Sequence, residues 1–140
     1  MGMRAASYGV PFMPVASLEG SDLPRVSGFR TVRDPYSGAE VYVIPAVRPD
    51  WAIVHVQQAD ERGNARIFGS TFWDRIMTRA ARRVIVTAEE IIPTAQLAEQ
   101  PELTAIPEFL VAAVVHAPGG AWPTSCPSYY DIDRPAVREY

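Results

Sequence analysis

Apolar residues occur in short runs along the chain, and the spacing within each run predicts a strand or a helix. Residues 51–56 are apolar or neutral at odd and even positions alike, which is typical of a strand buried on both faces of a sheet. The chain then becomes polar at Gln57, Gln58, Asp60 and Asn64. Gly63 and Asn64 predict a tight turn, followed by a second short strand over residues 65–68.

The next segment changes to helical spacing. One side of residues 71–83 carries the apolar positions Phe72, Ile76, Met77, Ala80 and Ala81, and this three-to-four spacing predicts a helix with Thr71 as its N-cap. Residues 84–87 are β-branched and predict a buried strand. A strand, a helix and a strand in this order favour a parallel crossover.

Turn residues divide the rest of the chain. Residues 29–33 and 41–44 flank Asp34 to Gly38, where Pro35 and Gly38 predict a β-hairpin turn. Residues 1–28 contain three prolines and four glycines, so we expect a loop-rich lead-in around one apolar piece at 10–15. Further on we expect a short helix over 93–100, a loop over 101–107, a third strand over 109–117 and an extended tail.

Together these elements predict an α/β fold. We expect an open, mostly parallel sheet with flanking helices and a β-hairpin excursion. Residues 1–28 form the lead-in and residues 29–140 form the domain.

Composition narrows the class of protein. The chain has 140 residues, 48% of them hydrophobic, and a net charge of −3. This is the composition of a globular protein, and it gives no electrostatic reason to expect a nucleic-acid partner. A single cysteine, Cys126, excludes an internal disulfide. We find no signal peptide and no run of about 20 apolar residues, so we expect a cytoplasmic protein without a membrane segment.

Candidate catalytic and binding side chains lie where the predicted strands end. Glu89 and Glu90 are weak candidates for a catalytic carboxylate; they point to opposite faces of a strand, so at most one faces a given pocket. The alternative is an ordinary solvated strand end. The amides of Gln57, Gln58 and Asn64 suit an acyl or carboxylate ligand.

The remaining reactive side chains favour structural roles. His55 and His116 lie inside predicted strands, where a buried and hydrogen-bonded histidine is the commoner outcome. Cys126 has no base close to it in sequence. Neither histidine belongs to a metal-ligand spacing, so we expect no metal site.

Four segments carry a resemblance to a known family. They are residues 55–66 (HVQQADERGNAR), 80–93 (AARRVIVTAEEIIP), 106–111 (IPEFLV) and 114–125 (VVHAPGGAWPTS), with 34–38 (DPYSG) and 43–50 (VIPAVRPD) upstream. In this order they resemble the A (alpha) subunit of class I coenzyme A transferases, closest to the glutaconate type. The resemblance runs through nearly the whole chain.

This resemblance implies a function and a partner. Family members move coenzyme A from an acyl thioester to a carboxylic acid through a glutamyl thioester. In heteromeric members the nucleophilic glutamate belongs to the B subunit, in a Ser-Glu-Asn-Gly type motif that is absent here. We therefore expect a B-type partner, an acyl-CoA as substrate, no bound cofactor, and no catalytic residue in this chain.

The resemblance covers only the C-terminal half of the family's A subunits. They are about twice this length and carry a glycine-rich coenzyme A motif in an N-terminal half that has no counterpart here. An isolated half would expose apolar surface and need a partner, so we expect an oligomer. Two alternatives stay open: a subunit of a related acyl-CoA ring-opening hydrolase, and a non-catalytic remnant or assembly module. We expect the isolated chain to be inactive.

Overall fold

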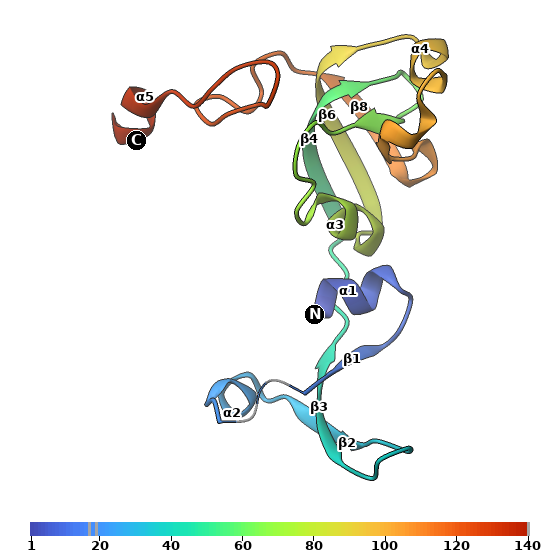
Figure 1. The fold of residues 1–140 in the computed structure, drawn as a ribbon, viewed down its shortest axis with the longest axis vertical. Coiled ribbons are helices and arrows are strands. Elements are labelled where there is room, and N and C mark those ends of the chain that lie inside the picture. Colours follow the sequence, from blue (N-terminus) through green and yellow to red (C-terminus); the bar gives the residue numbers. More distant parts are fainter. Residues whose placement is uncertain (17, 19, 140) are drawn as a thin grey trace.

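The computed structural model describes residues 1–16, 18 and 20–139. Figure 1 shows an elongated molecule with a three-stranded sheet at one end and a five-stranded sheet at the other. Helices α1 (Gly2–Ser7) and α3 (Asp74–Ala80) lie between the two sheets and contact each other. The C-terminal segment projects from the five-stranded sheet and ends in α5 (Arg134–Glu139).

The smaller sheet is antiparallel, in the order β1-β3-β2. It consists of β1 (Phe12–Val15), β2 (Arg30–Arg33) and β3 (Glu40–Pro45). Strands β2 and β3 form the predicted hairpin, and Gly38 has the positive φ of 74° that its turn requires. The Asp34 side chain closes this turn by accepting hydrogen bonds from the backbone amides of Tyr36 and Ser37.

Residues 1–28 contain more regular structure than the glycines and prolines predict. Helix α1, strand β1 and helix α2 (Leu23–Ser27) occupy much of this segment. Strand β1 pairs with β3, so it belongs to the same sheet as the hairpin. Pairing with a distant strand is a tertiary interaction, which local composition does not report.

The larger sheet has the order β7-β5-β4-β6-β8. Strands β4 (Trp51–Ala59), β6 (Arg83–Ile91) and β8 (Val111–His116) run parallel, with β6 in the middle. The short strands β5 (Ala65–Arg66) and β7 (Thr104–Ile106) are each antiparallel to their neighbours. The predicted α/β class and the parallel strand-helix-strand unit are confirmed.

Local details differ from the sequence predictions. Strand β7 lies in the segment expected to be loop between Pro101 and Pro107, because it adds to the edge formed by β5. Helix α4 (Thr94–Ala98) follows Pro93, and 3₁₀ turns precede β7 (Pro101–Leu103) and β8 (Glu108–Leu110). Helix α3 begins later than expected: Thr71 offers no side-chain cap, and its carbonyl instead accepts the Asp74 amide in a turn.

The core lies on one face of the larger sheet. Ala52, Val54, Val56, Val84 and Val86 are buried there, and the α3 residue Met77 packs against them. On the opposite face, Trp51 is 47% exposed, Ile53 65% and Val115 46%. The prediction that β4 is buried on both faces is therefore wrong for its first half within the described part of the chain.

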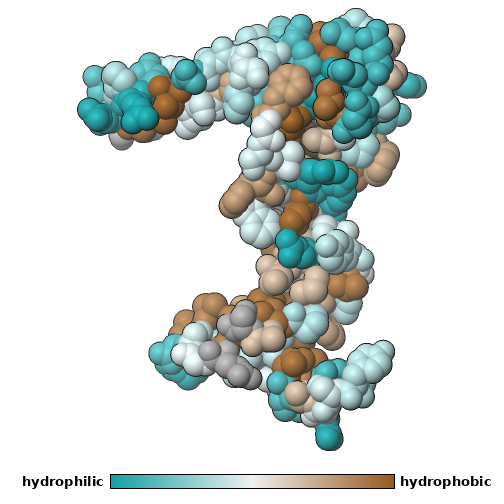
Figure 2. Space-filling model, viewed as in Figure 1, coloured by the Kyte–Doolittle hydropathy of each residue, from teal (hydrophilic) through white to brown (hydrophobic). Residues whose placement is uncertain are grey.

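Hydrophobic surface is visible over both sheets in Figure 2. Parallel sheets in α/β proteins are covered on both faces, so the exposed face of β4 and β8 is unusual. Among the helices of residues 1–16, 18 and 20–139, none combines the length and the hydrophobicity of a membrane span.

Candidate functional site

The three parallel strands bring polar side chains together at their carboxyl ends. The side chains of His55 on β4 and Glu89 on β6 meet at this edge, and Nε2 of His116 on β8 lies 3.2 Å from the backbone carbonyl oxygen of Glu89. The segment after β8, residues 117–133, which we call the C-terminal strap, lies against the same edge. In open α/β sheets this is the edge where ligands bind.

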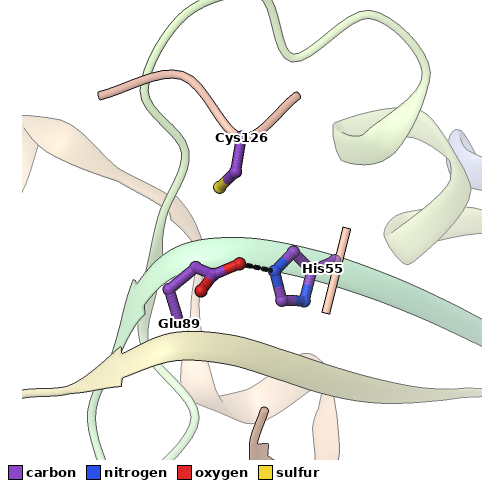
Figure 3. A group of neighbouring side chains, drawn as sticks. All are labelled: His55, Glu89 and Cys126. Carbon is purple, nitrogen blue, oxygen red and sulfur yellow. Dashed lines mark hydrogen bonds and ion pairs between the residues drawn. The ribbon is translucent and has the colours of Figure 1, made fainter. Parts of the chain in front are cut away.

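Glu89 is the centre of the group. Its Oε1 atom accepts a hydrogen bond from the Tyr130 hydroxyl and lies 2.7 Å from Nε2 of His55, while Oε2 accepts the Gly119 amide at 2.7 Å. The side chain of Glu89 is only 4% exposed. Its two oxygens thus connect β4, β6 and the C-terminal strap. Figure 3 shows the contact between Glu89 and His55.

Burial and hydrogen bonding act in opposite directions on this carboxylate. Burial alone raises the pKa of Glu89, but hydrogen bonds from Tyr130, the Gly119 amide and His55 outweigh it and lower the pKa below its ordinary value. Burial, together with the nearby Glu89 carboxylate, raises the pKa of Tyr130 to about 12. Glu89 is therefore an ionised acceptor, and Tyr130 is a neutral donor.

His55 is fixed from several sides. Its Nδ1 atom lies 2.9 Å from the hydroxyl of Thr87 on the adjacent strand. Gly120 packs so closely on the imidazole that a Cβ atom there would lie 2.6 Å from Cε1 of His55. Gly120 is thus required for the close approach of the C-terminal strap to this ring.

Cys126 completes the buried group. The thiol belongs to the C-terminal strap, is 3% exposed, and points toward Glu89 and His55 (Figure 3). Burial raises the pKa of the Cys126 thiol, and the Glu89 carboxylate raises it further. A thiol in this state is a poor nucleophile.

Glu90 faces the other way, as strand alternation predicts. It accepts hydrogen bonds from Gln58 at 3.0 Å and from the Tyr129 hydroxyl at 2.8 Å. These two hydrogen bonds, from Gln58 first, lower the pKa of Glu90. Glu90 is solvent-exposed, in contrast to buried Glu89.

The other two amides predicted at the site bind protein groups. Gln57 is 4% exposed and connects to the backbone of Phe68 at both its amide atoms, and to the Pro127 carbonyl. The side-chain amide of Asn64, in the turn after β4, donates hydrogen bonds to the carboxylates of Asp60 and Glu108. Of the three amides, Gln58 is the one placed beside a candidate carboxylate.

The grouping of these side chains was not predicted from the sequence. The sequence presents His55, Glu89 and Cys126 as three separate candidates, and nothing in it identifies Tyr130 or Gly119 as a contact of Glu89. Parallel pairing of β4 with β6 places His55 near Glu89, although 34 positions separate them. The one available signal was that His55 and Glu89 both lie near the ends of predicted parallel strands.

Comparison with known proteins places the chain in a family. The family described as coenzyme A transferase matches residues 1–117. The A subunit of glutaconate CoA-transferase from Acidaminococcus fermentans is 36% identical over 157 residues, covering all of this chain and 49% of that protein. The IpdA subunit of a cholesterol ring-cleaving hydrolase from Mycobacterium tuberculosis is 32% identical, covering 99% of this chain and 51% of that protein.

Solved structures support the same family assignment. A crystal structure of the A. fermentans glutaconate coenzyme A-transferase superposes with a TM-score of 0.91 at 36% identity, covering 99% of this chain and 49% of that one. A structure of the decarboxylase AibA/AibB gives a TM-score of 0.88 at 41% identity, covering 99% and 50%. This chain thus spans about half the length of these relatives. It belongs to the coenzyme A transferase family, as a class I, A-subunit-like chain.

Proposed function

We propose that the chain is part of a CoA-transferase A subunit and moves coenzyme A between an acyl-CoA and a carboxylic acid. In this proposal a B-type subunit supplies the nucleophilic glutamate. The observation that carries it is the similarity to a glutaconate CoA-transferase A subunit over the whole chain, at a TM-score of 0.91.

The two glutamates at the sheet edge support a partner that brings the nucleophile. A carboxylate that attacks a thioester needs an oxygen that can approach the carbonyl carbon. Both oxygens of Glu89 already accept hydrogen bonds from protein groups in a buried position. Glu89 is therefore suited to fixing the C-terminal strap, and we assign it no covalent role.

The surface charge near the edge also favours a shared site. A cavity of about 530 Å³ is lined by Gly119, Trp122, Tyr130, Asp131 and Asp133. Two carboxylates repel the phosphates of coenzyme A, so this cavity is suited to a side chain of the partner subunit. In our proposal the phosphates of coenzyme A bind to polypeptide other than the described residues of this chain. Gln58 and Glu90 face the acyl group.

The exposed face of the larger sheet supports a hetero-oligomer. Trp51, Ile53 and Val115 are exposed where a parallel sheet is normally covered. We propose that polypeptide corresponding to the unmatched half of the relatives covers this face, and that the B-type subunit contacts the carboxyl edge. The complex would work in the cytoplasm, where the Cys126 thiol stays reduced.

Copurification tests this proposal. The chain is tagged in its own cells, and the complex is analysed by native mass spectrometry and assayed for CoA exchange between an acyl-CoA and a free acid. Recovery with a B-type subunit and exchange activity supports it. Free CoA without exchange would identify a hydrolase, and recovery of the chain alone without activity would identify a remnant.

A matched pair of variants localises the acyl site. We expect Gln58→Ala to lower kcat/KM of the complex about tenfold or more, corresponding to a lost hydrogen bond of about 1.4 kcal/mol. Gln100→Ala, which removes an exposed amide beyond α4, should leave it unchanged. Equal effects of both variants would contradict the assignment of Gln58.

A further inference from the structure

The buried group at the sheet edge contains three different metal-binding atoms. These are a ring nitrogen of His55, a carboxylate oxygen of Glu89 and Sγ of Cys126, and all three lie within 4.8 Å of one another. They come from three separate segments, namely β4, β6 and the C-terminal strap, and converge on one point (Figure 3).

We propose that His55, Glu89 and Cys126 form a binding site for a divalent transition-metal ion of the Zn²⁺ class. Imidazole nitrogen, carboxylate oxygen and thiolate sulfur are the ligand types that zinc takes in proteins. Bonds of about 2.0–2.3 Å place the ligand atoms of a tetrahedral ion roughly 3.3–3.8 Å apart. Small shifts of the three side chains, about 1 Å or less, therefore suffice to bring them around one ion.

Neighbouring groups already orient two of the ligands. Nδ1 of His55 lies 2.9 Å from the Thr87 hydroxyl, and in the metal-bound form Nδ1–H donates to that oxygen while Nε2 faces the ion. The Gly119 amide holds Oε2 of Glu89 at 2.7 Å, and Oε1 faces His55 while it also accepts the Tyr130 hydroxyl. Metal-ligating histidines and carboxylates are typically held by outer contacts of this kind.

Proton balance is simple at this site. His55 binds the ion through Nε2 in the tautomer that carries its proton on Nδ1. The thiol of Cys126 must lose its proton as the metal–sulfur bond forms, and that proton leaves to solvent.

An ion here would connect the C-terminal strap to the sheet. Three protein ligands leave one position of a tetrahedral ion for a water molecule or another side chain. Because the ligands come from segments far apart in sequence, binding stabilises the folded arrangement of residues 117–130 against the carboxyl edge. This inference does not depend on the CoA-transferase activity proposed above.

Cobalt substitution tests the site on the full chain. We expect Co²⁺ to bind one equivalent per chain and to produce a thiolate-to-cobalt charge-transfer absorption, which only Cys126 can supply because it is the single cysteine. Zn²⁺ should displace the cobalt and raise the melting temperature. Cys126→Ser should abolish the absorption band, and Thr87→Val should weaken cobalt binding about 10- to 100-fold.

The control is Glu99→Gln, which removes an exposed carboxylate at the end of α4 and should leave binding unchanged. Circular dichroism of each variant separates lost binding from lost folding, and Cys126→Ser changes only the sulfur of the side chain to oxygen. The absence of a charge-transfer band in the folded wild-type chain would overturn the proposal. So would equal cobalt affinity in the wild type and Cys126→Ser.

Discussion

Two adjacent glutamates show how position alone separates chemically identical residues. Alternation along β6 predicts that Glu89 and Glu90 point to opposite faces, and their burial confirms it. The sequence could not identify which of them is buried, because Glu89 is covered by Gly119 and Tyr130 of the C-terminal strap. Those contacts depend on how a segment after the sheet folds back on it.

Asp60 provides a residue-scale prediction of pH dependence. It is completely buried, and its Oδ1 accepts the backbone amides of Arg62, Gly63 and Asn64 at 2.8–3.0 Å. Burial raises the pKa of Asp60, but the hydrogen bonds, including one from the Asn64 side chain, outweigh it and lower the pKa below 3.8. We expect Asp60→Asn to cost roughly 1.5–3 kcal/mol of unfolding free energy at neutral pH.

The sign of the pH effect follows from the lowered pKa. The stability that ionised Asp60 contributes is present above its unfolded pKa and is lost as the pH falls through its lower folded pKa. Urea unfolding should therefore show a constant difference in unfolding free energy between wild type and Asp60→Asn near neutral pH. This difference should narrow below about pH 4. Asp50→Asn, at an exposed carboxylate, should show almost no gap. A gap that stays constant in acid would contradict the prediction.

At the scale of elements, turn residues and apolar spacing predicted the helices, strands and turns that are determined by residues close together in the sequence. The hairpin around Gly38 and the parallel unit of β4, α3 and β6 were predictable from turn residues and apolar spacing. Strands β1 and β7 and helix α5 were not, since pairing partners or neighbouring segments define them. Glu89 could be predicted as a candidate because it ends a strand. Tyr130 could not, because its contact with Glu89 depends on how the C-terminal strap folds.

The two faces of β4 give a prediction at this scale. Val54 is 4% exposed and Ile53 is 65% exposed, although they are neighbours in one strand. We expect Val54→Ala to cost about 2 kcal/mol of unfolding free energy in the isolated chain, because it leaves a cavity in the core. Ile53→Thr should change it by less than about 0.5 kcal/mol.

Urea unfolding of the purified chain distinguishes the two substitutions. Threonine keeps the β-branched shape at position 53, so strand propensity is nearly matched. A cost at Ile53 equal to that at Val54 would show that both faces of β4 are buried in the isolated chain.

At the scale of the whole molecule, the exposed face of β4 and β8 is the surface that the proposed assembly would bury. Its apolar residues lie outside the core of this chain, but they would supply the hydrophobic contact of the proposed assembly. Ile53 lies in the middle of this face, between Trp51 and His55 on β4 and paired with Ile85 on β6. A lysine there would place an ammonium group in the centre of any interface on this face.

We therefore expect Ile53→Lys to weaken assembly with the covering polypeptide by more than about tenfold, equivalent to 1.4 kcal/mol or more. Native mass spectrometry of the tagged complex measures the loss, and circular dichroism shows that the chain itself still folds. Tyr36→Lys is the matched control, since Tyr36 is 98% exposed in the hairpin turn at the other end of the molecule. If both substitutions left the assembly intact, the partner would bind elsewhere, and the exposed face of the sheet would have no part in forming the enzyme.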